Sequence, residues 1–217
     1  MTAMPAAPVL HATEGDVRRA RMRELAGGRF ERSCDASTRF FETHVDTIAA
    51  ACLGLATRFR NGGRLLVFGS GASATDAHHV AVEFVHPVLV GKRALPAVAL
   101  TSDVATLTGA MPGGGFAAAL STLGRANDIA MSISTGAADA AARRGMQRAR
   151  AMEMLTLALT GGTANARETV DADFHLNVPD DDPMIVQEVH ETLYHVLWEL
   201  VHVFLDHRVS AEGGRHA

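Results

Sequence analysis

The chain has 217 residues, a length that fits one domain with a full hydrophobic core. A formal net charge of −4 with 47% hydrophobic residues gives no basic footprint for nucleic acid. No uninterrupted apolar run reaches the roughly 18 residues that a membrane span needs, so we expect neither a nucleic-acid partner nor a membrane partner.

The N-terminal part of the chain is predicted to be a flexible arm followed by helices. Residues 1–15 mix Pro, Ala and Thr without periodicity, and they lack the basic leader and apolar core of a signal peptide. From residue 16 to about residue 60, apolar side chains recur at helical spacing. Gly27-Gly28 is expected to divide this lead-in into a short helix and a long one. So much helix before the first strand predicts that it covers one face of a sheet and packs against a second subunit.

Two cysteines, Cys34 and Cys52, fall within the helical lead-in. Neither belongs to a CxxC pair, so we interpret both as buried small hydrophobic residues. Free thiols are typical of a reducing compartment, and we therefore expect a cytoplasmic protein.

The stretch Leu65–Phe84 carries the most informative pattern. An apolar run, LLVF, is followed by the small-residue turn 69–73 and then by a helix. Such a turn gathers backbone N–H groups at a helix N-terminus, which favours an anion and most often a phosphate. On the helix, His79 and Glu83 are four residues apart and therefore share one face, close enough to share a proton path or a metal.

Strands and helices alternate in the remainder of the chain. Further strands are expected over 94–100, 128–133, 154–159 and 173–178, and helices over 137–150 and from Pro183 to about residue 207. Residues 109–116, GAMPGGGF, are expected to form a glycine-rich loop. Mostly apolar strands that alternate with helices predict an α/β fold with a parallel sheet covered on both faces.

Three of the predicted turns carry Ser, Thr or Gly where a strand ends, after Phe68, Ile133 and Leu159. In open α/β sheets ligands bind outside the carboxyl ends of the strands. We therefore expect these turns to converge on one site.

A dinucleotide site is the first alternative, because Gly69, Gly71 and Ala74 fit the GxGxxA pattern directly after a strand. That fingerprint also needs an acidic residue about 20 positions further on, at the end of the second strand. In this chain the acidic residue at the end of the second predicted strand is Asp103, which lies about 30 residues past the glycines. The spacing argues against nicotinamide or flavin binding.

The segment GSGASATDAHHVAVEF, with SIST at 132–135 and QEVHETLYH at 187–195, resembles the sugar isomerase (SIS) fold and, within it, the phosphoheptose isomerases. The similarity runs from about residue 30 to residue 207, and the HxxxE and Qx7H patterns are more specific than the glycines. The resemblance implies a three-layer flavodoxin-like fold, with a five-stranded parallel sheet flanked by helices and an N-terminal helical extension. It implies a single SIS domain over 16–217 with its α/β core at 64–207, in a homotetramer with sites at subunit boundaries.

The resemblance also implies roles for individual residues and one zinc ion per subunit. By position, the metal ligands fall on His79, Glu83, Gln187 and His195, with Glu83 as general base and His195 as general acid. The residues that match the substrate site are Ser70, Gly71, Ala72, Ser73, Glu83, Ser134, Thr135, Gly136 and Gln187. Gln187 and His195 are eight residues apart, about 12 Å along a helix, so we expect facing helices from two subunits to complete each site.

The residue types suit aldose–ketose interconversion independently of the resemblance. That reaction moves a proton between adjacent carbons through an enediol, and it needs a carboxylate base together with an acid or a metal at the oxygen. The leading hypothesis is therefore isomerisation of sedoheptulose 7-phosphate to D-glycero-D-manno-heptose 7-phosphate, or of a related sugar phosphate. The alternative is a SIS module without catalysis, a regulator that binds a sugar phosphate or another protein.

The chain departs from the family pattern in the second phosphate turn. Where the isomerases have S-T-S-G-N-S, this chain has S-T-G-A-A-D, so two hydroxyls are missing and Asp139 stands in place of one. A carboxylate beside a phosphate weakens binding unless it is turned away or paired. This departure favours the regulator or a different substrate, whereas the complete HxxxE and Qx7H set favours the enzyme.

Overall fold

The computed structural model describes residues 13–104, 115–163 and 170–213, with side chains described as far as residue 206. The elements in chain order are α1 (Glu14–Arg60), β1 (Leu65–Phe68), α2 (Ser73–Val85), β2 (Ala97–Ala99), the 3₁₀ turn η1 (Leu100–Ser102), α4 (Gly115–Leu123), β3 (Ile129–Ile133), α5 (Ala140–Ala151), β4 (Leu155–Gly161), β5 (Phe174–Val178) and α6 (Pro183–Gly213). Most of the predicted arm, residues 1–12, lies outside the described residues.

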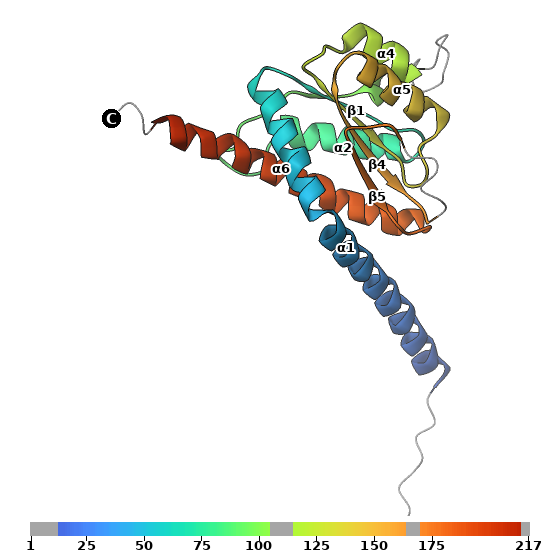
Figure 1. Ribbon diagram of the computed structural model, residues 1–217. Coiled ribbons are helices and arrows are strands. Elements are labelled where there is room, and N and C mark those ends of the chain that lie inside the picture. Colours follow the sequence, from blue (N-terminus) through green and yellow to red (C-terminus); the bar gives the residue numbers. More distant parts are fainter. Residues whose placement is uncertain (1–12, 105–114, 164–169, 214–217) are drawn as a thin grey trace, which may run out of the picture.

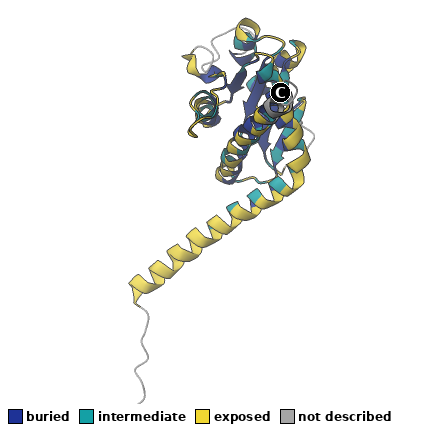
Figure 2. Ribbon diagram, turned by 90° about the vertical axis from the view of Figure 1, so that its left-hand side faces the viewer, coloured by how far each residue is buried: buried dark blue, intermediate teal, exposed yellow. Residues whose placement is uncertain are grey.

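Helix α1 is a single helix of 47 residues, so the predicted division at Gly27-Gly28 is wrong. It begins with a capping box, in which the Thr13 side chain accepts from the backbone N–H of Asp16 and the Asp16 carboxylate accepts from that of Thr13. Two glycines cost the helix about 2 kcal/mol relative to alanine, which a helix of this length tolerates. The N-terminal half of α1 extends away from the rest of the molecule and is largely exposed (Figures 1 and 2).

The five strands form one parallel sheet in the order β2-β1-β3-β4-β5. This is the flavodoxin-like order, in which the chain reverses its direction of winding between β1 and β3. The predicted fold class is confirmed. The second strand is shorter than expected, Ala97–Ala99, and lies at the edge of the sheet.

Alternating strand residues point to two separate cores. Leu65 and Val67 face the layer that contains α1, α2 and α6, whereas Leu66 and Phe68 face α4 and α5. The structure therefore has three layers, as Figure 1 shows. No helix in the described ranges is both long enough and apolar enough to span a bilayer.

Two local predictions need correction. Gly115 and Phe116, expected in a glycine-rich loop, open helix α4, because the alanine-rich sequence that follows them supports a helix; residues 109–114 lie outside the described residues. Cys52 is buried, and burial raises the pKa of its thiol to about 12. Cys34 is exposed rather than buried, because it lies on the outer face of α1, whereas its neighbour Ala36 faces the core.

Candidate functional site

The turn after β1 is shaped by two glycines at the carboxyl edge of the sheet. A Cβ atom on Gly69 would lie 2.6 Å from the carbonyl oxygen of Ile133, so only glycine allows β1 and β3 to end this close together. Gly71 has a φ of +58°, in the left-handed region. Helix α2 then begins without a side-chain cap. The backbone N–H groups of Ser73, Ala74 and Thr75 donate to carbonyls of the turn at 3.0–3.2 Å, so the start of α2 favours an anion through the helix dipole and the N–H groups that precede residue 73.

The turn after β3 lies beside it, because β1 and β3 are neighbours in the sheet. The Ser134 hydroxyl donates to the Ala137 carbonyl at 3.1 Å, and the backbone N–H of Gly161 donates to the Gly136 carbonyl at 3.1 Å. Thr135, which lies between Ser134 and Gly136 in this turn, is half-buried. The predicted substrate-binding turns 70–73 and 134–136 therefore share one rim, at the point where α/β sheets of this order bind ligands.

Asp139, the residue that departs from the family pattern, is the N-cap of α5. Its side chain accepts from the backbone N–H of Ala142 at 2.7 Å. Burial acts to raise the pKa of this carboxyl, but hydrogen bonds from the Ser70 hydroxyl and from backbone N–H groups outweigh it, so the pKa lies below its ordinary value. Asp139 is thus ionised at neutral pH and is tied to Ser70, a residue of the predicted anion site.

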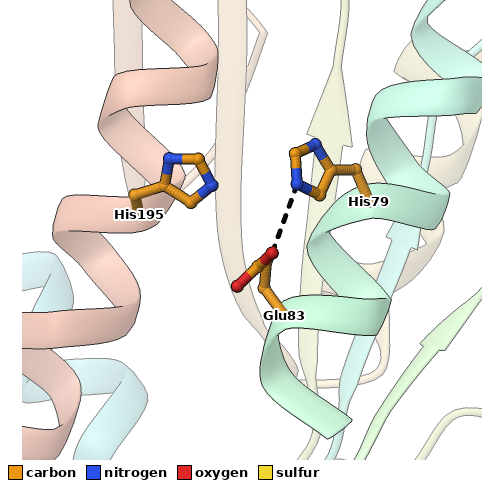
Figure 3. A group of neighbouring side chains, drawn as sticks. All are labelled: His79, Glu83 and His195. Carbon is orange, nitrogen blue, oxygen red and sulfur yellow. Dashed lines mark ion pairs between the residues drawn. The ribbon is translucent and has the colours of Figure 1, made fainter. Parts of the chain in front are cut away.

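Glu83 and His79 come from one face of α2, and His195 reaches them from α6 (Figure 3). The Nε2 atom of His79 lies 3.3 Å from Oε1 of Glu83. One ligand atom from each of the three residues lies within 4.8 Å of the other two. All three belong to one chain, so the meeting of these side chains needs no second subunit.

Gln187, the fourth predicted ligand, contacts another residue of α2, and its role at the metal stays a prediction. Its Nε2 donates to Oδ1 of Asp76 at 2.7 Å. Asp76 is buried, and burial raises the pKa of its carboxyl although the Gln187 hydrogen bond and His79 act to lower it. No sequence pattern singled out Asp76, since its position in the first turn of a helix is ordinary for an acid.

Tyr194 is the second residue that the sequence analysis did not assign to the site. Its ring is fully buried, and its hydroxyl lies 2.8 Å from Nδ1 of His79. The ring also packs edge-on against His79 and His195, at centroid distances of 5.1 Å and 5.0 Å. Only the three-dimensional arrangement reveals this contact, because Tyr194 and His79 are 115 residues apart.

The donor set fits zinc. Zinc binds imidazole nitrogen and carboxylate oxygen, and catalytic zinc sites commonly have three protein ligands and one open position. Tetrahedral bonds of about 2.0–2.2 Å place ligand atoms roughly 3.4 Å apart, close to the 3.3 Å between His79 and Glu83. Among the His, Cys, Asp and Glu side chains of the described residues, His79, Glu83 and His195 form a group that offers such ligands.

Comparison with known proteins agrees with the fold and the motifs. Residues 30–161 match the family model described as the SIS domain. A phosphoheptose isomerase of Roseiflexus sp. is 39% identical over 176 residues, which cover 79% of this chain and 88% of that protein. Solved phosphoheptose isomerases from Neisseria gonorrhoeae and Francisella tularensis each superpose with a TM-score of 0.72, at 29% and 32% identity. They cover 83% and 82% of this chain, and 99% and 96% of their own chains.

Proposed function

The chain belongs to the phosphoheptose isomerases of the SIS domain family, and from this premise we propose that it isomerises sedoheptulose 7-phosphate to D-glycero-D-manno-heptose 7-phosphate. The observation that carries the proposal is the meeting of Glu83, His79 and His195 from two facing helices. An enediol mechanism requires a carboxylate base and an imidazole acid, and here the Glu83 and His195 side chains have atoms within 4.8 Å of each other.

The proposed reaction begins with the ketose carbonyl at C2. Glu83 removes a proton from C1 while His195 gives a proton to the C2 oxygen, which produces the enediol. Glu83 then returns a proton to C2 while His195 takes the proton of the C1 hydroxyl, which leaves an aldehyde at C1. A zinc ion held by His79, Glu83 and His195 would act as a Lewis acid at the substrate oxygens.

The rim is proposed to hold the phosphate of the substrate. The turn 70–73 lies at the start of α2, where the helix dipole favours an anion, and it supplies the hydroxyl of Ser73. Ser134, Thr135 and Gly136 supply the neighbouring turn. Gln187 lies on the same seam between α2 and α6, where it can contact the sugar.

We further propose a homotetramer in the cytoplasm. The exposed half of α1 carries large apolar side chains at Val17, Met22, Leu25 and Phe30, which an assembly of several copies would cover. The two free cysteines, Cys34 and Cys52, suit a reducing compartment. Completion of each site by a neighbouring subunit stays a prediction.

The test is solvent exchange in deuterated water. Zinc-loaded protein incubated with sedoheptulose 7-phosphate is expected to produce the aldose with deuterium at C2. Glu83→Gln should lose this exchange by a factor of about 10² to 10⁴, the usual contribution of a general base. Since Glu83 is also a proposed ligand, zinc content must be measured for each sample. Binding of sugar phosphate without any exchange by the wild type would instead identify the non-catalytic alternative.

A further inference from the structure

The hydroxyl of Tyr194 lies in a buried position next to a proposed ligand. The side chain is fully buried, and its one polar atom contacts Nδ1 of His79 at 2.8 Å. A phenol is neutral in the physiological range, because the ordinary pKa of tyrosine is about 10. A neutral phenol can donate one hydrogen bond and can also accept one.

The other nitrogen of His79 faces the carboxylate of Glu83, with 3.3 Å between Nε2 and Oε1. Without a cation, this geometry favours a proton on Nε2, because Nε2–H then donates to the carboxylate. Nδ1 is consequently a bare acceptor, and the Tyr194 hydroxyl must donate to it. Both ring nitrogens of His79 are satisfied in this arrangement.

A cation bound at Nε2 requires the opposite tautomer. Nε2 then offers its lone pair, the ring proton lies on Nδ1, and Nδ1–H has to donate to an acceptor. The oxygen of Tyr194 is 2.8 Å away and is able to accept. A backbone carbonyl or a carboxylate could serve only this second state, whereas a hydroxyl serves both.

We propose that Tyr194 is a positioning residue that holds the His79 ring in both states and reverses the direction of its hydrogen bond when a cation binds. This inference rests on the zinc site of the proposed function. Edge-on packing of the Tyr194 ring against His79 and His195 fixes the hydroxyl in place while the bond reverses. The ring orientation of His79 is therefore the same with and without metal.

The tautomer of His79 can be measured by ¹⁵N NMR of histidine-labelled protein, with and without zinc. Its signals are assigned by their loss in His79→Asn. Metal-free wild type is expected to carry the proton on Nε2, and zinc-loaded wild type on Nδ1. Tyr194→Phe, which keeps the ring and removes the hydroxyl, is expected to weaken zinc binding about 10- to 100-fold, the usual effect of losing a residue that orients a ligand.

Trp198→Phe is the matched control, because Trp198 also lies buried on α6 but packs against His202 rather than His79. It should leave the zinc affinity unchanged, and thermal denaturation should show that both variants are folded. Identical His79 tautomers in the two states, or equal zinc affinity of Tyr194→Phe and wild type, would overturn the inference. Either result would leave wild-type zinc binding and isomerisation intact. Conversely, zinc-dependent tautomer reversal without isomerisation would reject the proposed activity alone.

Discussion

Replacing Asp139 by serine tests how this chain handles the phosphate of its substrate. Asp139 caps α5 and is bonded to the Ser70 hydroxyl, so its negative charge lies at the rim where the phosphate is proposed to bind. Serine is about as good an N-cap as aspartate, and Asp139→Ser therefore removes the charge while it keeps the cap. The expected result is a lower KM for the sugar phosphate.

The magnitude follows from the contact with Ser70. A phosphate that bonds the Ser70 hydroxyl, as Asp139 does, would have its phosphorus about 6 Å from the Asp139 carboxylate, because both groups lie one hydrogen bond of about 2.7 Å from the same oxygen. At that distance two unit charges repel by about 0.7 kcal/mol in water and by about 3 kcal/mol at an effective dielectric constant of 20. Asp139 is exposed, so we take about 1–2 kcal/mol for the dianion, which is roughly a 5- to 30-fold change in binding.

Steady-state kinetics with sedoheptulose 7-phosphate, and the dissociation constant of inorganic phosphate, measure this effect. Asp139→Asn, which removes the charge with almost no change of shape, should behave like Asp139→Ser. Asp139→Ala should also tighten phosphate binding but should lose about 1 kcal/mol of stability with the cap. The gain should shrink as salt is added, because the carboxylate is exposed. An unchanged or raised KM for both the serine and the asparagine variant would refute the reasoning.

Two further predictions concern stability. Asp128 is buried and binds the Arg64 side chain at 2.7 Å, so Asp128→Ala should lower the unfolding free energy by about 3–5 kcal/mol in a urea titration. The control Asp171→Ala removes an exposed ion pair with Arg150 and should lower it by under about 1 kcal/mol. A loss for Asp128→Ala no larger than that of the control would contradict this. Burial lowers the pKa of His190 to about 4 from an ordinary 6.5. As the pH falls, the unfolded chain therefore binds a proton at this residue before the folded chain does. The unfolding free energy should fall by about 3 kcal/mol between pH 6.5 and pH 4. Urea titrations across this range should give a flatter profile for His190→Asn, and parallel profiles would rule out this role.

Most of the fold follows from short-range patterns in the sequence. Apolar runs that end in small polar residues identified the strands, and their alternation with helices required a parallel sheet. Where prediction failed, a local glycine signal was outweighed by its surroundings. Gly27 and Gly28 remain helical within a long helix, and Gly115 opens α4 because alanines follow it.

The site was predictable only where helix geometry fixes which residues share a face. The four-residue spacing of His79 and Glu83 is such a case, and the structure places the two side chains 3.3 Å apart. Asp76 and Tyr194 could not be found in this way, because their importance depends on which atoms of a distant helix they meet. The buried contacts of both residues became visible only once α2 and α6 were placed side by side.

The relative direction of α2 and α6 explains how Gln187 and His195, eight residues apart on α6, can both lie beside α2. Asp76 contacts Gln187 and, further along α2, His79 contacts Tyr194, so the two helices run in the same direction. Gln187 therefore lies near the start of α2 and the phosphate rim, whereas His195 lies about 12 Å further along, next to Glu83. We interpret Gln187 as a contact to the sugar between the phosphate and the reacting carbons. With His79, Glu83 and His195 as the ligands, the fourth position that catalytic zinc keeps open would be available to the substrate oxygens.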